Sequence, residues 1–276
     1  MRLLFEGLTR KLRLTKERLR KFEDWIENAN KADNTKSLDA RTNQYDKAEE
    51  LITFYTFAPI ELRKDKANVI QEVLKLANIR VQLEGEIRLD FERQFEPSKD
   101  YLKWLENEVV RHPVKYIRKQ GLEHIANGKP LETNTHVDVV LESDNFLVLV
   151  EMKFTSDIST QTTFNVNRNQ LARMIDVGIS EAERNGKKII VLLCSPSEFY
   201  QKRSRFFYYK IQEYSDFRKI EEDIGWRDID KVRQCLLAVG WLPLEKVVDV
   251  IYRDFDSPDL DEAMSFFKER NLTLKL

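Results

Sequence analysis

The sequence has few of the residues that interrupt or cross-link a chain. Its 276 residues include 8 glycines, 7 prolines and 2 cysteines. So little glycine and proline excludes collagen-like and low-complexity chains. The two cysteines, Cys194 and Cys235, form no Cys-x-x-Cys motif, which excludes a disulfide scaffold and argues against a zinc site. We therefore expect an ordinary apolar core with both thiols reduced.

Long apolar runs and an excess of charge are also missing. Apolar runs such as Phe146–Val150 are far shorter than the roughly 20 residues of a membrane helix, and the N-terminus has no signal-peptide pattern. The 46 Lys and Arg against 47 Asp and Glu give a net charge of -1, so any polyanion would need a local basic patch. We expect a soluble, cytoplasmic protein with no membrane association.

Several catalytic motifs are absent as well. The chain has no glycine-rich phosphate loop, no Gly-x-Ser-x-Gly, no His-Glu-x-x-His and no kinase-like set of motifs. These absences argue against nucleotide hydrolysis, serine hydrolysis, zinc proteolysis and kinase chemistry. We expect no organic cofactor.

The chain divides into regions of different patterning. Residues 1–95 have helical spacing and predict a mainly helical N-terminal region for substrate recognition or dimerisation. Residues 96–224 alternate between helical and strand patterns, which predicts an α/β core: a mixed sheet flanked by helices. Residues 225–276 are predicted to be a mixed C-terminal extension that packs on this core.

The predicted core contains a β-hairpin. Strands are expected over Thr135–Leu141 and Phe146–Lys153, with a turn-like link between them. The second strand is apolar up to Val150, which is typical of a central strand covered on both faces. A helix over Tyr101–Arg111 precedes the hairpin. A helix over Asn167–Arg184 and a strand over Lys188–Cys194 follow it.

Three charged residues on this hairpin predict chemistry. Residues two apart in a strand face the same way, so Glu151 and Lys153 project together, and the hairpin brings Asp138 beside them. Two carboxylates and an ammonium suit a Mg²⁺ ion and a metal-assisted hydrolysis. Lys153 is the only lysine with an acidic residue two positions earlier. The alternative is that Glu151 and Lys153 are solvated at the rim of the sheet as an ion pair.

This arrangement resembles the PD-(D/E)XK nuclease superfamily, which has the restriction-endonuclease-like fold. The resemblance runs from the helix at Tyr101 to the strand ending at Cys194 and follows the family order: helix, hairpin with Asp and then Glu-x-Lys, helix, strand. It implies that Asp138, Glu151 and the backbone carbonyl of Met152 bind Mg²⁺, which Mn²⁺ can replace. It implies that Lys153 is the catalytic lysine.

The resemblance extends to neighbouring residues. Gln170 stands where many members carry a polar residue on the following helix, whereas Val137 replaces the proline and Met174 a tyrosine found in some groups. Members often add an acid from the preceding helix. Glu106 is the candidate here, although a solvated helix glutamate is the alternative.

Other side chains are candidates for contact with substrate. His136 shares the strand face of Asp138, and the arginines near the start of the following helix could bind phosphate. A basic and aromatic stretch over Lys202–Lys210 offers further contacts, with an ordinary solvated helix face as the alternative. The candidates are His136, Arg168, Arg173, Lys202, Arg203 and Arg205.

These observations favour a Mg²⁺-dependent nuclease that hydrolyses DNA, acting as an endonuclease, with a homodimer as an open alternative. DNA rather than RNA follows from the resemblance alone. A catalytically inactive nucleic-acid-binding or assembly protein with the same fold is the second hypothesis. A structural protein that binds another protein through its N-terminal helices is the third.

Overall fold

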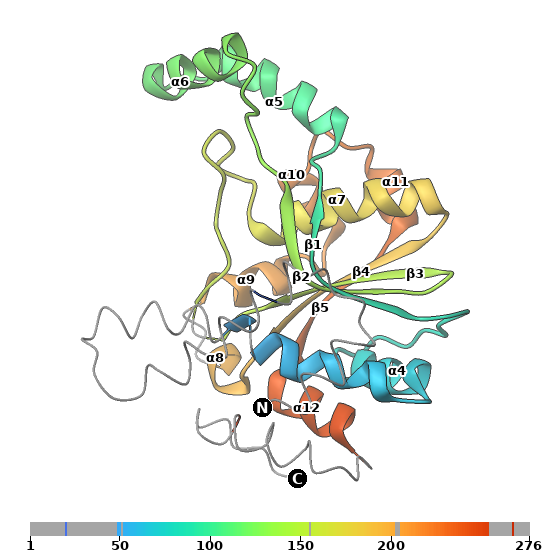
Figure 1. The fold of residues 1–276 in the computed structure, drawn as a ribbon. Helices are drawn as coiled ribbons and strands as arrows, with labels where there is room; N and C mark the ends of the chain where they lie inside the picture. Colours follow the sequence, from blue (N-terminus) through green and yellow to red (C-terminus); the bar gives the residue numbers. More distant parts are fainter. Residues whose placement is uncertain are drawn as a thin grey trace, which may run out of the picture.

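The computed structural model describes residues 20, 49–50, 52–154, 156–201, 205–253 and 267. Within these ranges, five strands form one open mixed sheet in the order β1-β2-β3-β4-β5 (Figure 1). The first three strands are antiparallel neighbours, whereas β3, β4 and β5 run parallel. The strands are β1 Arg88–Phe95, β2 Thr135–Glu142, β3 Phe146–Met152, β4 Lys188–Ser195 and β5 Leu236–Pro243.

Helices cover both faces of this sheet. One core joins the sheet to α4, α12 and the helical residues 52–57, and the other joins it to α7, α9, α10 and α11. Figure 1 shows α7 and α11 above the sheet and α4 and α12 below it. The helices are η1 Ala58–Leu62, α4 Lys66–Leu76, α5 Lys99–Arg111, α6 Lys115–Ala126, α7 Gln170–Asn185, α8 Ser197–Gln201, α9 Phe206–Glu213, α10 Phe217–Asp223, α11 Ile229–Cys235 and α12 Leu244–Tyr252.

The central position of β3 follows from its sequence. Leu147 and Leu149 pack in one core while Val148 and Val150 pack in the other, so both faces are covered. The predicted hairpin, the helices on either side of it and the strand at Lys188 are confirmed to within a few residues. The prediction of an α/β fold with a mixed sheet is therefore confirmed.

The sheet crosses both predicted region boundaries. The predicted helical region ends in β1, and the predicted C-terminal extension supplies β5. Helical residues 52–57 pack directly on the sheet. Residues 1–19 and 21–48, which include the basic stretch near the N-terminus, lie outside the described residues. Within the described residues, the sheet therefore takes strands from all three predicted regions.

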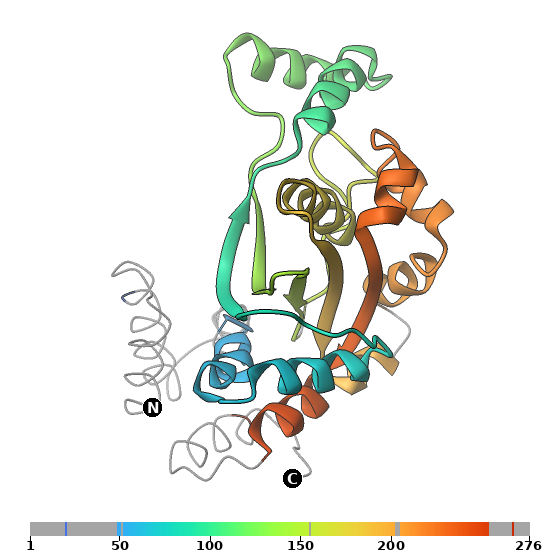
Figure 2. The same ribbon diagram turned by 90° about the vertical axis from the view of Figure 1, so that its right-hand side faces the viewer.

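Two helices, α5 and α6, project from one end of the sheet as a pair (Figures 1 and 2). They have a small core of their own, to which Tyr101, Leu105, Val109, Leu131 and Phe164 contribute. We call this helix pair the arm. Because β2 begins shortly after α6, the arm is joined to the strand that carries Asp138.

No helix in the described ranges combines the length and apolar character needed to cross a membrane.

The layered core predicts a large effect of truncating β3. Leu149 is fully buried in the central strand, whereas Leu237 on β5 is 41% exposed. We expect Leu149→Ala to lower the free energy of unfolding by about 2–5 kcal/mol, and Leu237→Ala to lower it by less than about 1 kcal/mol. Urea denaturation followed by circular dichroism measures both, and equal losses would contradict this packing.

Candidate active site

The β2–β3 hairpin opens at the position of Asp138. Pairing between the two strands ends at Val139 and Val150, so the backbone of β2 no longer supplies hydrogen bonds to the end of β3. The Asp138 side chain takes over this role, because its Oδ2 accepts a 2.7 Å hydrogen bond from the Met152 N–H. On the other side, β3 stays paired with β4, and the Lys153 N–H donates to the Cys194 carbonyl at 2.8 Å. The end of β3 is thus held from both sides.

Glu151 is buried at this end of the strand, with 2% of its surface exposed. Its Oε1 accepts a hydrogen bond from Lys153 Nζ at 2.7 Å and another from Gln170 Nε2. Its Oε2 is buried and has no hydrogen-bond partner within the described ranges. The ion pair with Lys153 that the alternative interpretation expects is present, but Glu151 is buried rather than solvated at the rim of the sheet. A buried carboxylate oxygen without a partner is costly, and a cation would offset that cost.

Gln170 is held in place by the start of α7. Asn169 caps the helix, accepting from the Ala172 N–H at 3.1 Å. The Gln170 N–H donates to the Ser159 carbonyl, and its Oε1 accepts from the Ser159 N–H at 3.3 Å. These bonds aim the Nε2 of Gln170 at Glu151. The predicted association of Gln170 with the site is therefore present in the structure.

Glu49 is a further acidic residue at the site, which the sequence does not predict. Its Oε1 accepts from the Phe154 N–H at 2.8 Å and lies 3.9 Å from Lys153 Nζ. Ser156 Oγ donates to the same carboxylate. Glu49 thus fixes the chain just beyond β3 and helps to hold the lysine. No local pattern links it to a hairpin about 100 residues later in the sequence.

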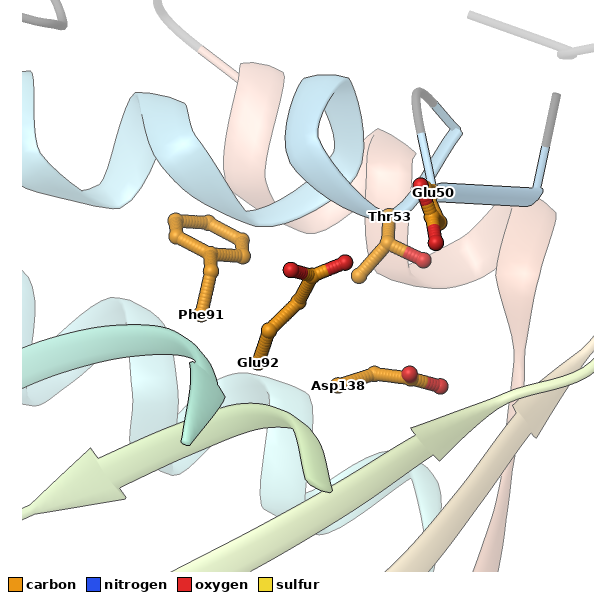
Figure 3. A pocket seen from close by; sticks show the side chains of 5 residues that line it. All are labelled: Glu50, Thr53, Phe91, Glu92 and Asp138. Atoms are coloured by element: carbon orange, nitrogen blue, oxygen red, sulfur yellow. The ribbon is translucent and has the colours of Figure 1, made fainter. Parts of the chain in front are cut away.

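A small cavity beside Asp138 brings in two more acids (Figure 3). Glu50, Thr53, Phe91, Glu92 and Asp138 line it. Pairing between β1 and β2 is interrupted opposite Asp138, where Glu92 has a φ of 50°. Such a φ is uncommon for a residue other than glycine and is typical of a strained or functional position.

The carboxylates oppose one another electrostatically. Burial, together with the charges of Glu151 and Glu49, raises the pKa of Asp138 well above its ordinary value. Burial also raises the pKa of Glu49. Burial alone would lower the pKa of Lys153, but Glu151, Glu49 and Asp138 outweigh it and raise that pKa. With all of these carboxylates ionised, one ammonium would leave a net negative site, and a cation would offset the repulsion that raises the pKa of Asp138.

The donor set fits a hard divalent cation. Asp138 and Glu151 offer carboxylate oxygens, and the Met152 carbonyl lies between Glu151 and Lys153 in sequence, as the resemblance implies. Within the described ranges, no group of three His, Cys, Asp or Glu side chains could hold a metal ion. Protein ligands would therefore fill only part of the coordination shell of the ion. This suits Mg²⁺, because bound Mg²⁺ usually retains several water ligands.

Arg168 is buried inside the protein, which argues against the predicted contact with substrate. It is fully buried, with ion pairs to Glu132 at 2.8 Å and Asp176 at 2.9 Å. Its guanidinium lies 3.5 Å from the centroid of the Tyr101 ring. Arg168 therefore joins α7 to the arm inside the protein. Its position just before a helix N-terminus gave no sign of these buried partners.

The other predicted residues lie apart from this cluster or at its margin. Glu106 is exposed on α5, in the arm, so the expected acid from that helix does not join the site. Glu49, from an earlier helical segment, lies there instead. His136 is exposed on β2, two residues before Asp138, and Arg173 is half-buried on α7.

The predicted basic stretch is only partly described. Lys202 and Arg203 lie outside the described residues. Arg205 precedes α9, and its guanidinium lies 5.1 Å from the ring centroid of Phe199. Contact of these three basic residues with substrate stays a prediction.

The raised pKa of Asp138 predicts a pH-dependent stability. The folded protein favours the protonated form of Asp138. Wild type therefore loses stability as the pH rises from the ordinary pKa of an aspartate through the raised pKa of Asp138. Asp138→Asn cannot ionise and still accepts from Met152. In EDTA, we expect this variant to be more stable than wild type at pH 7, with the difference disappearing in acid. Urea denaturation across pH measures it.

Asp65→Asn is a control for which the expected change in stability at pH 7 has the opposite sign. The Arg63 hydrogen bonds lower the pKa of Asp65, so its ionised form favours folding and removing it should slightly destabilise the protein at pH 7. A wild type that gains stability relative to Asp138→Asn as pH rises would contradict the charge repulsion inferred at the site.

Comparisons of the chain with protein-family models, with curated proteins and with solved structures find no match.

Proposed function

We propose that this protein is a metal-dependent nuclease of the PD-(D/E)XK type that hydrolyses phosphodiester bonds in DNA and acts as an endonuclease. One observation carries the proposal: Glu151 is buried beside Asp138 and Lys153, and its Oε2 has no hydrogen-bond partner among the residues that the structure describes. Burial and the charge of Glu151 raise the pKa of the second carboxylate, Asp138, and a purely structural ion pair would not need that carboxylate there.

The position of the cluster agrees with this function. It lies at the carboxyl end of β3, where β3 runs parallel to β4, and beside the N-terminus of α7. Ligand sites in open α/β sheets commonly lie at the carboxyl ends of parallel strands. The α7 N-terminus also favours an anion such as a phosphate. The restriction-endonuclease-like arrangement of the sheet is part of the proposal.

Asp138, Glu151 and the Met152 carbonyl would hold a Mg²⁺ or Mn²⁺ ion. When bound, the ion would stabilise charge on the phosphate and lower the pKa of a water. Asp138 is already fixed by the Met152 N–H, and Glu151 by Lys153 and Gln170. Such pre-positioned ligands do not have to be ordered during the reaction.

Lys153 acts as a charged donor in this proposal. Its raised pKa keeps the ammonium protonated at neutral pH, so it is not the group that removes a proton from water. Its hydrogens can orient the attacking water and its charge can stabilise the negative charge that develops on the phosphate. Glu49 and Glu151 act as its positioning partners.

A catalytically inactive nucleic-acid-binding protein is the second candidate. The observation in its favour is that Lys153 already neutralises part of the charge of Glu151 through a 2.7 Å ion pair. Such a protein would bind nucleic acid but would not cleave it in the presence of a divalent ion. DNA rather than RNA as substrate rests on the family resemblance.

Cleavage assays test the proposal. Plasmid, linear duplex, single-stranded DNA and RNA are incubated with Mg²⁺, Mn²⁺ or EDTA. We expect cleavage of DNA that requires the metal and falls by about 10²-fold or more in Lys153→Met and Glu151→Gln.

The ion pair of Lys187 and Glu142 supplies matched controls. It has the same 2.7 Å separation and a similar lysine exposure, but lies at the other end of the hairpin. Lys187→Met and Glu142→Gln should retain activity. The nuclease assignment would be overturned by cleavage that does not need the metal or by no cleavage of any substrate. It would also be overturned if the variants of both ion pairs lost the same amount of activity.

A further inference from the structure

The outer helix of the arm, α6, is exposed over more than half of its residues. Gly121 is its only buried residue. Figures 1 and 2 show α6 and α5 beyond the end of β1 and β2, away from the two helical layers. Because α6 buries so little surface, packing against the core does not account for the residues on its outer face.

The arm is nevertheless firmly attached. A Cβ at Gly121 would lie 2.2 Å from Val109 Cγ1, so glycine allows α6 to approach α5 closely. The His124 ring packs edge-on against Phe164, with centroids 5.3 Å apart. Tyr101 donates a 2.6 Å hydrogen bond to the buried Glu132. These contacts hold the arm in one orientation, so its surface is preorganised for a partner.

The outer face of α6 is basic. Lys115, Arg118 and Lys119 fall on one face by their helical spacing and line a shallow groove together with Leu122, Glu123 and Ala126. Residues 111–129 contain five Lys and Arg and one acid, a net charge of +4, in a chain whose net charge is -1. That one acid, Glu123, lies 3.9 Å from the 79% exposed Lys119.

The arm that carries this basic face is connected to the candidate active site through two segments of the chain. β2 begins at Thr135, just after the arm, and Asp138 is three residues further on, or about 10 Å along the strand. The exposed His136 lies between them. The loop that places Phe164 against the arm continues to Gln170, which contacts Glu151. The arm is therefore connected to the active site both through β2 and through the loop that leads to α7.

We propose that the basic face of α6 binds the phosphate backbone of the nucleic acid that the active site cleaves. This inference rests on the proposed function. Lys and Arg on a fixed helix neutralise phosphates without reading sequence, which positions a duplex. A second copy of the chain is disfavoured as the occupant, because a symmetric contact through this face would bring like charges together.

Binding measurements on a charge-neutralised arm test this inference. Lys115→Gln, Arg118→Gln and Lys119→Gln are combined, and fluorescence anisotropy in EDTA measures the Kd for a labelled 30-base-pair DNA duplex. We expect at least a tenfold weaker affinity near 0.1 M salt. The slope of log affinity against log salt should become shallower by about 0.9 for each phosphate that the variant no longer neutralises. All three changes are on an exposed helix, so the melting temperature should stay the same.

A second triple variant is the matched control: Arg218→Gln, Lys219→Gln and Arg233→Gln. It removes the same charge from exposed positions on α10 and α11, where each residue already has an acidic partner. We expect the control to bind DNA as wild type does. Equal losses of affinity in both triple variants would overturn a specific role for α6.

The outcomes separate this inference from the nuclease assignment. Metal-dependent cleavage with unchanged DNA affinity in the α6 variant would overturn the α6 inference alone. Loss of affinity in that variant, with no cleavage by wild type, would support α6 as a nucleic-acid surface and overturn the nuclease. Concentration-dependent dimers of wild type that the α6 variant does not form, with unchanged DNA affinity, would assign the face to a second copy instead.

Discussion

A buried glutamate at the end of an apolar central strand is the constraint on which this structure depends. Glu151 is almost fully buried, so its charge must be compensated by groups that other elements bring to it. Lys153 follows it on the same strand, and Gln170 arrives from the start of α7. Asp138 lies close enough for the Glu151 charge to raise its pKa. Elements from both sides of β3 thus converge on Glu151, whose Oε2 has no hydrogen-bond partner in the part of the chain that the structure describes.

The sequence predicts the local part of this arrangement. The strand pattern of Thr135–Leu141 and the apolar run before Glu151 predict the hairpin. The hairpin in turn predicts that Asp138 lies beside the Glu-x-Lys motif. The sequence does not predict β1, because Arg88–Phe95 follows a long helical pattern and its pairing with β2 is non-local. Glu49 is missed for the same reason. It contacts Phe154 across about 100 residues of sequence, a relation that no periodicity expresses.

Buried polar contacts explain where sequence reasoning assigned the wrong role. Arg168 has the residue type and position of a phosphate ligand, yet it lies buried between Glu132 and Asp176 and beside Tyr101. This network ties the base of the arm to α7, the helix that begins with Gln170. The same contacts therefore position both the arm and one edge of the active site. Local sequence shows charge but not burial, and burial decides which arginines can reach a substrate.

The most direct test of the account is divalent-ion binding in the absence of nucleic acid. Calorimetric titration with Mn²⁺ should show binding to the wild-type protein that is abolished in Glu151→Gln and retained in Glu142→Gln, with both variants folded. That result would establish Glu151 as a ligand for the ion. Binding that is equal in all three proteins, or that is absent from the wild type, would contradict the claim that this buried carboxylate is part of a metal site.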